Sequence, residues 1–559
     1  MVDAHRVGTI VSIPETNKAL VLVDEKLVEN NTSLIGRLVG VKQGNMLIIG
    51  VITDSKAYNE LNEPDKMKRL KELLDQRIVS EQEIHLVYVE FVTAIKEETP
   101  IERTPLNFLI KPSQEVFLLE NHNTIKELNQ RFDSIGYFIG ENIKQPLHIK
   151  DFKEEAYHTL IVGKTGSGKS SLAMMLMSLY AKNSDMSFVI IDPVGEFARA
   201  FEGREGTFPI RKVWQNLNRS VTIIKPGISH KLDHKEIFIG FCKYFNLFEP
   251  IGITNQKIRE ASEKLLKLLE IETFSELPLL TFEEFVEKTT KKRNNTYELA
   301  EIYSASNKAK RDEITEKLET QESLEEFYKK YKTIQRFFAN KPGIIEEIQK
   351  LSTENRLTFC IDLSEIEWLN PAYANEIKAL IVERICRELY KLGKTAYNQG
   401  RSLNTLAILD EAHRFVPAKG LSEDTEEQDK TTKAIKTSII ETRKFGLGWL
   451  IISTRASNLD RRIFEETRNK FIGFGLHTGS DADLLREYFK GKDILTRYAN
   501  MQDPEDVLSK NKKVQFMVHG PITVLSREHP EFIQVFSFEE FLKHNSLDET
   551  KIAKEWDFF

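Results

Sequence analysis

The chain has 559 residues, of which 40% are hydrophobic and 29% charged, and its formal net charge is −6. This length suggests two to four domains with cores of their own, and the mild acidity excludes a protein that is basic throughout, although a local basic channel is compatible with it. Three cysteines without a CxxC pair argue against a disulfide framework or a zinc site.

The N-terminal sequence has no apolar signal segment, and no stretch approaches the roughly 18 apolar residues of a membrane helix. We therefore expect a cytoplasmic protein that does not enter the membrane.

Residues 1–125 are expected to form a small antiparallel β-barrel, since short β-rich runs alternate with turn signals. A polar stretch from residue 63 to about 76 is expected to form a helix that interrupts these strands. Nothing here has the pattern of a catalytic site, so a purely structural module and a surface that contacts DNA or another subunit both stay open. The predicted strands are 7–13, 19–24, 34–40, 46–52, 84–93 and 116–119.

From residue 137 strands alternate with helices, which is typical of a parallel α/β sheet. We assign residues 126–250 and 350–500 to this sheet domain and the charged helical stretch 251–349 to an insertion. The charged faces of such helices are either solvated or contact DNA or a partner. Residues 501–559 are expected to contribute edge strands at 514–518, 522–525 and 533–536, and a tail that either packs on a neighbouring subunit or frays at its end.

The stretch GKTGSGKS, residues 163–170, matches the phosphate-binding template G-x-x-x-x-G-K-[ST] at every fixed position. An apolar strand precedes it and a helix-forming run follows, as the template requires. Lys169 is expected to reach the β- and γ-phosphates, and the Ser170 hydroxyl to ligate Mg²⁺. The expected cofactors are ATP and Mg²⁺, and the predicted nucleotide-binding residues of this loop are Gly163, Lys164, Thr165, Gly166, Ser167, Gly168, Lys169, Ser170 and Ser171.

An apolar run ending in two carboxylates follows downstream, Leu406-Ala-Ile-Leu-Asp410-Glu411. After a phosphate-binding loop this pattern indicates that Asp410 holds Mg²⁺ and that Glu411 activates the attacking water. The alternative is a helix N-terminus whose dipole the two acids complement.

Three further elements are candidates for the site. Glu196, in Asp192-Pro-Val-Gly-Glu196-Phe, is expected at the nucleotide edge of the sheet, or else in a plain β-turn. Arg443 closes a helix predicted over 431–444; it is either a basic residue that matches the helix dipole or an arginine finger for a neighbouring γ-phosphate. Thr454 follows a predicted strand, where a polar residue senses the γ-phosphate.

Taken together, these motifs resemble the HerA branch of the HerA/FtsK motor superfamily. The resemblance implies a RecA-like P-loop ATPase core with a HAS-type barrel. It implies a hexameric ring that moves double-stranded DNA through its centre and works with a nuclease or other effector. The roles it implies fall on Lys169 and Ser170 (nucleotide and Mg²⁺), Asp410 (Mg²⁺), Glu411 (catalytic), Glu196 (second acid) and Arg443 (finger).

The sequence departs from the family pattern at Thr454, where many relatives have glutamine, so the sensing of the γ-phosphate is in question. There is also no obvious basic stripe for DNA. Four lysines soon after Asp410 are candidates for a pore-facing element or for ordinary solvated surface: Lys419, Lys430, Lys433 and Lys436.

Three functions follow from these observations. The first is an ATP-driven DNA translocase or helicase in DNA end processing or phage defence. The second is a ring scaffold that assembles and activates a separate effector enzyme. The third is a protein-remodelling ATPase. ATPases of that class lack the DPVGEF element that this chain has, which argues against this function.

Overall fold

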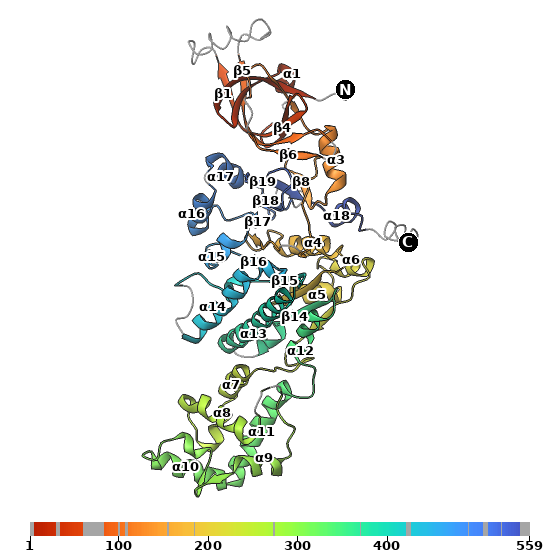
Figure 1. The fold of residues 1–559 in the computed structure, drawn as a ribbon. Coiled ribbons are helices and arrows are strands. Elements are labelled where there is room, and N and C mark those ends of the chain that lie inside the picture. Colours follow the sequence, from red (N-terminus) through yellow and green to blue (C-terminus); the bar gives the residue numbers. More distant parts are fainter. Residues whose placement is uncertain are drawn as a thin grey trace.

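The fold is described from a computed structural model. It describes residues 5–29, 34–59, 83–98, 101–106, 110–153, 156–183, 185–271, 274, 276–368, 371–420, 426–489, 491–506, 513–526 and 528–547. Three tiers follow one another along the molecule: an N-terminal barrel, a large α/β layer and a helical lobe (Figure 1). The predicted α/β class, with an N-terminal barrel and a helical insertion, is confirmed.

The barrel closes because β2 pairs with both β1 and β5. Valine and isoleucine side chains fill its interior, as expected for β-branched residues on a pleated surface. Register shifts near Gly50 and Asp54 bend the long β4–β5 hairpin. In order the strands are β2 (Lys18–Val23), β1 (Arg6–Glu15), β7 (Glu115–Leu118), β3 (Leu38–Gln43), β4 (Met46–Asn59) and β5 (Glu83–Lys96), with β6 (Glu102–Thr104) beside β5. The predicted helix at 63–76 lies outside the described residues.

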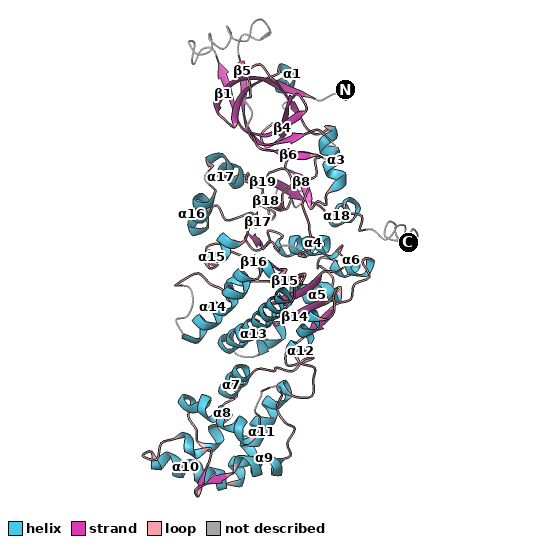
Figure 2. Ribbon diagram, in the orientation of Figure 1, coloured by secondary structure: helices cyan, strands magenta, loops and turns pink. Residues whose placement is uncertain are grey.

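The central sheet is parallel from β11 to β17 and antiparallel beyond (Figure 2). β9 precedes the glycine loop (residues 163–170) and lies between β16 and β17. β16 therefore separates β9 from β15, the strand that leads into Asp410. In order the strands are β11 (Thr222–Ile224), β14 (Thr358–Asp362), β10 (Ser187–Asp192), β15 (Thr405–Leu409), β16 (Leu447–Ser453), β9 (Thr159–Val162), β17 (Asn469–Gly473), β18 (Gln515–His519), β19 (Glu531–Val535) and β8 (Gly136–Phe138).

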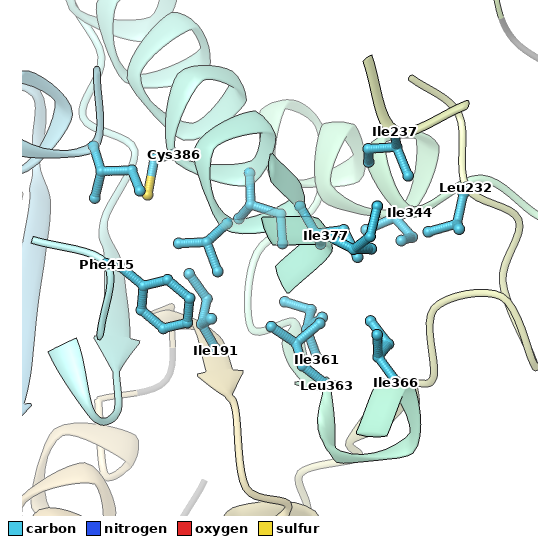
Figure 3. Packing of buried hydrophobic residues seen from close by; sticks show 14 of the residues in the cluster. Ile191, Leu232, Ile237, Ile344, Ile361, Leu363, Ile366, Ile377, Cys386 and Phe415 are labelled. Atoms are coloured by element: carbon cyan, nitrogen blue, oxygen red, sulfur yellow. The ribbon is translucent and has the colours of Figure 1, made fainter. Parts of the chain in front are cut away.

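Both faces of the sheet are covered, so its central strands are apolar throughout rather than alternating. On β10, Val189 and Ile191 belong to one hydrophobic cluster, and Phe188 and Ile190 to the other. Figure 3 shows the first cluster, where Ile377 of α13 packs over the ends of the strands. The helices of this layer are α4 (Lys169–Ala181), α5 (Glu196–Glu202), α6 (Ile210–Asn216), α13 (Pro371–Asn398), α14 (Glu426–Glu441), α15 (Arg461–Glu466), α16 (Gly479–Tyr488), α17 (Lys492–Ala499) and α18 (Phe538–His544).

The helical lobe is inserted between β11 and β14 and lies at the end of the molecule remote from the barrel (Figure 1). Its helices pack around phenylalanines, including Phe285, Phe327 and Phe338, which are fully buried. The lobe contains α7 (Lys235–Tyr244), α8 (Ile258–Leu268), α9 (Phe282–Thr289), α10 (Lys308–Glu319), α11 (Gln321–Phe338) and α12 (Ile344–Gln349).

The C-terminal segment differs from the prediction. β18 and β19 are interior strands of the sheet of their own chain, and β8 is the edge. The predicted strand at 522–525 is a turn that makes one isolated bridge, between Leu147 and Thr523. The helix predicted to reach residue 444 ends at Glu441. The aromatic tail beyond residue 547 lies outside the described residues.

Within the described part of the chain, no helix is both long and apolar enough to cross a membrane.

Candidate functional site

The glycine loop joins β9 to α4 at the carboxyl edge of the parallel strands. Gly166 and Gly168 have φ angles of +82° and +83°, which residues with side chains rarely adopt. A Cβ at Gly168 would also lie only 2.7 Å from the Val514 side chain. Gly168 is the N-cap of α4 and offers no side chain to the first N–H groups of the helix. The positive end of the α4 dipole therefore faces the loop, which favours an anion there.

Lys169 begins α4 and lies among the acids of the site. Its side chain is mostly buried, and its Nζ donates to the Lys164 carbonyl oxygen at 2.9 Å. Burial lowers the pKa of Lys169, and the charges of Glu411, Asp410 and Glu196 oppose this effect. The structure thus brings the predicted phosphate-binding lysine together with the three predicted acids.

Ser170, the next residue of α4, contacts Glu196. Its hydroxyl donates to Glu196 Oε2 at 2.9 Å. Glu196 begins α5, and its backbone N–H donates to Asp192 at 3.1 Å. The link between the glycine loop and the DPVGEF turn is therefore a direct side-chain contact.

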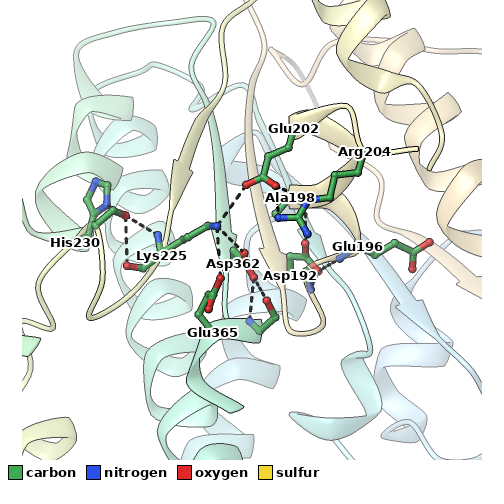
Figure 4. Close-up of polar contacts among 12 residues, drawn as sticks. Asp192, Glu196, Ala198, Glu202, Arg204, Lys225, His230, Asp362 and Glu365 are labelled. Carbon is green, nitrogen blue, oxygen red and sulfur yellow. Dashed lines mark hydrogen bonds and ion pairs between the residues drawn. The ribbon is translucent and has the colours of Figure 1, made fainter. Parts of the chain in front are cut away.

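Asp192 holds this turn in place through its carboxylate (Figure 4). Its carboxylate also accepts the N–H groups of Gly195 at 2.8 Å and of Ala198 at 2.9 Å. Burial, followed by the neighbouring charge of Asp362, raises the pKa of Asp192 to about 6. Asp192 therefore fixes the start of α5, from which Glu196 projects towards Ser170.

Asp410 and Glu411 follow β15 at the same edge. Asp410 Oδ1 accepts the Glu411 N–H at 2.9 Å. Burial raises the pKa of Asp410 well above its usual range, and Asp192 and Glu411 add to this effect. A cation here would relieve this crowding of negative charge, and the hydroxyl of Ser170 and the carboxylate of Asp410 are oxygen ligands of the kind that Mg²⁺ binds. The residues present thus fit Mg²⁺.

Glu411 has a left-handed backbone, with φ +47°, which is uncommon outside glycine. His413 Nδ1 lies 3.3 Å from Glu411 Oε2 and 3.4 Å from the hydroxyl of Ser453, at the end of β16. Burial lowers the pKa of His413, against the effect of the Glu411 charge. His413 and Ser453 therefore connect Glu411 to the adjacent strand, a contact that the sequence did not indicate. Thr454, the next residue, is half-buried at this edge.

Arg443 is not brought to this edge. It lies in a 3₁₀ turn, Arg443–Phe445, that precedes β16, whereas the glycine loop follows β9. Because the seven residues of β16 lie between these two edges, Arg443 and its own glycine loop are separated by roughly 20 Å. The Arg443 guanidinium carbon lies over the Tyr157 ring, 4.7 Å from its centre. The guanidinium carbon of Arg468 lies 5.6 Å from the centre of the same ring.

Two acidic residues near the site were missed by sequence reasoning. Asp362 ends β14 in register with Asp192, and Lys225 Nζ lies 3.9 Å from its Oδ2 (Figure 4). The rule that identified Asp410, an apolar strand ending in an acid, would also have found Asp362. Glu505 lies against the glycine loop, since a Cβ at Gly166 would clash with its carboxylate. No local motif marks Glu505.

The four candidate pore lysines have different surroundings. Lys436 forms an ion pair with Asp460 at 2.8 Å, whereas Lys419 and Lys433 are exposed. The side chain of Lys430 lies outside the described residues.

The chain is similar in sequence to known helicases. Residues 133–389 match the family model for the central domain of helicase HerA. The chain is 26% identical over 428 residues to the DNA double-strand break repair helicase HerA of Sulfolobus acidocaldarius, covering 75% of this chain and 73% of that protein. It is 24% identical over 342 residues to the protein of the same name from Saccharolobus solfataricus, covering 60% of this chain and 58% of that protein.

Two solved structures are similar over much of the chain. VirB4 of Thermoanaerobacter pseudethanolicus matches with a TM-score of 0.42 and 12% identity, over 74% of this chain and 98% of VirB4. The plasmid coupling protein TrwB, in complex with a non-hydrolysable GTP analogue, matches with a TM-score of 0.38 and 14% identity, over 74% of this chain and 92% of TrwB.

Proposed function

Since the chain is a HerA-like P-loop ATPase, we propose that it hydrolyses ATP with Mg²⁺ and uses the free energy to move double-stranded DNA through a hexameric ring. The observation that carries the hydrolysis is the convergence of Lys169, Ser170, Glu196, Asp410 and Glu411 at one edge of the sheet. The proposal for DNA is supported by the two HerA relatives, which are DNA double-strand break repair helicases.

In this proposal each residue has one task. The loop N–H groups and Lys169 bind the phosphates, and Ser170 and Asp410 would hold Mg²⁺, which neutralises charge on the phosphate oxygens. Glu411 orients a water molecule towards the γ-phosphorus and accepts its proton as the bond from phosphorus to the leaving ADP oxygen breaks. His413 positions Glu411, and Glu196 holds Ser170. Thr454 is the proposed sensor of the γ-phosphate.

Arg443 is proposed to act on the site of a neighbouring subunit. Its position at the edge of the sheet opposite to its own glycine loop supports a role in another chain's site rather than in its own. An arginine in this role stabilises the negative charge of the transition state. Under this proposal hydrolysis requires the ring.

The effector partner is part of the proposal in two forms. In the first, the motor feeds DNA to a nuclease or other effector in end processing or phage defence. In the second, the ring scaffolds and activates that enzyme without moving along DNA. An effector that keeps full activity with a hydrolysis-deficient ring would favour the scaffold.

Duplex DNA is expected to stimulate ATP hydrolysis, and its binding should weaken steeply with salt because phosphate contacts release counterions. For about six neutralised phosphates, the logarithm of the binding constant should fall with a slope near −5 against the logarithm of the salt concentration. The measurement is ATPase rate and DNA affinity across a salt series, with single-stranded DNA of equal length as the control. If duplex DNA neither binds nor stimulates hydrolysis at any salt concentration, the translocase proposal fails and the scaffold remains.

Glu505→Gln is expected to tighten ATP binding. The Glu505 carboxylate lies against the phosphate-binding loop, where it repels the triphosphate. Because the side chain is exposed, the repulsion is screened, and the gain should be only about two- to fivefold, within the ~1 kcal/mol typical of exposed charges. A fluorescent ATP analogue measures the affinity, and Asp506→Asn, the same charge change one residue on, is the control. Equal effects of both changes would contradict a specific role for Glu505.

A further inference from the structure

Three side chains with metal-binding groups meet where the barrel rests on the α/β layer. They are Glu90 of β5, Asp493 at the start of α17 and His529 just before β19. One ligand atom of each lies within 4.8 Å of the other two. All three are partly buried. The cluster is therefore built from both tiers and belongs to neither the nucleotide site nor the barrel core.

Hydrogen bonding orients His529 towards the two acids. Its Nδ1 lies 3.0 Å from the Pro530 carbonyl oxygen, which can only accept, so Nδ1 carries the proton. Nε2 lies 3.3 Å from Glu90 Oε2, with the Asp493 carboxylate beside it. A proton or a cation held between these atoms would stabilise the arrangement. In proteins, histidine ligands to metals are held by the same kind of Nδ1–H contact to a carbonyl.

The separation of the histidine from one of the carboxylates fits a small tetrahedral ion. Zn²⁺ binds histidine nitrogen and carboxylate oxygen at about 2.0–2.2 Å, so two of its ligands lie about 3.3–3.5 Å apart. The distance of 3.3 Å between His529 Nε2 and Glu90 Oε2 agrees with this separation. The fourth position is left for water, as in zinc sites with three protein ligands.

The charged surroundings help to select the metal. Lys18 of β2 attracts both carboxylates, and its Nζ also lies 3.5 Å from Glu15. Arg497 of α17, which stacks on Phe532 at 4.3 Å, is a second cation facing the acids. Because these two cations already offset the carboxylates, an ion held by charge alone would bind weakly. Imidazole ligation favours Zn²⁺ over Mg²⁺ and Ca²⁺, which prefer oxygen ligands.

We propose that Glu90, Asp493 and His529 form a Zn²⁺ site that fastens the barrel to the α/β layer. Glu90 and His529 are 439 residues apart in the sequence, so a shared ion would join two distant parts of the chain. The site uses no cysteine, which is why the count of cysteines gave no indication of it.

The test is a Zn²⁺ titration of the full chain. Bound metal is first removed with a chelator, and the titration is done in excess Mg²⁺, which occupies sites made only of oxygen ligands. The parent protein is expected to bind one Zn²⁺ per chain and to show a higher Tm with it, since an ion bound to the folded state stabilises that state. His529→Asn should weaken binding by more than about 100-fold, because losing even a residue that supports a ligand costs 10- to 100-fold.

His122→Asn is the matched control. His122 Nε2 lies 3.5 Å from Glu97 Oε1, and no second acid among the described residues completes a metal-binding group there. Asparagine preserves the helix-capping role of this residue. This variant should bind Zn²⁺ like the parent. If His529→Asn unfolds, the nearly isosteric Asp493→Asn replaces it. Binding to the parent no tighter than to the His529 or Asp493 variant, equal loss in His122→Asn, or tighter binding of Mn²⁺ than of Zn²⁺ would overturn the proposal.

Discussion

The Glu411→Gln protein is expected to bind ATP as the parent does and to hydrolyse it about 10²- to 10⁴-fold more slowly, the range for removal of a general base. Glutamine keeps the size of the side chain but cannot take the proton of the attacking water. Lys169 and Ser170, which bind the phosphates and Mg²⁺ in this proposal, are unchanged. Steady-state hydrolysis and equilibrium nucleotide binding, measured on the same preparation, separate these two effects.

Glu365→Gln is the control for this experiment. Glu365 lies close to the acidic cluster but is half-exposed, with Oε1 3.6 Å from Lys225 Nζ (Figure 4). Removing its charge should change turnover by less than about twofold, as expected for an exposed ion pair. Loss of ATP binding in Glu411→Gln, or turnover within a few-fold of the parent, would contradict the role of Glu411.

Arg443→Ala is expected to lower ATP turnover by about 10³- to 10⁵-fold while leaving ATP binding intact, the effect of removing an arginine finger. The physical reason is the position of Arg443. It lies at the opposite edge of the sheet from its own glycine loop, so in the proposed ring its charge would stabilise only a neighbour's site. Turnover and nucleotide affinity are measured on assembled rings.

Arg468→Ala is the control for packing. Arg468 stacks on the same ring, Tyr157, at 5.6 Å compared with 4.7 Å for Arg443. If Arg443 acts only by holding Tyr157, the two alanine variants should lose similar activity. If Arg443 acts on the neighbouring phosphate, only Arg443→Ala should lose turnover on the expected scale.

Much of the α/β layer was predictable because its signals are local. The strand before the glycine loop, the helix after it and the strand before Asp410 each combine an apolar run with a motif. The parallel sheet then brings Lys169, Ser170 and Asp410 to one edge because its strands share a direction.

The remaining differences come from contacts between distant residues. β18 and β19 became interior strands through antiparallel pairing with β17 and β8, and no single stretch of sequence specifies such partners. The position of Glu505 against Gly166 likewise depends on how a C-terminal loop folds back. Arg443 lies at the edge of the sheet opposite to the glycine loop because it precedes a parallel strand, whereas the loop follows one. The order of the elements along the chain is enough to imply this placement.

The most direct test of the central claim, a hydrolysis site shared between neighbouring chains, is ATP turnover in rings assembled from Lys169→Ala and Arg443→Ala chains together. Each variant alone should be inactive. In mixed rings, some interfaces pair an intact Lys169 with an intact Arg443 from the neighbour, so part of the activity should return. Full inactivity of mixed rings that assemble and bind ATP normally would contradict the shared site.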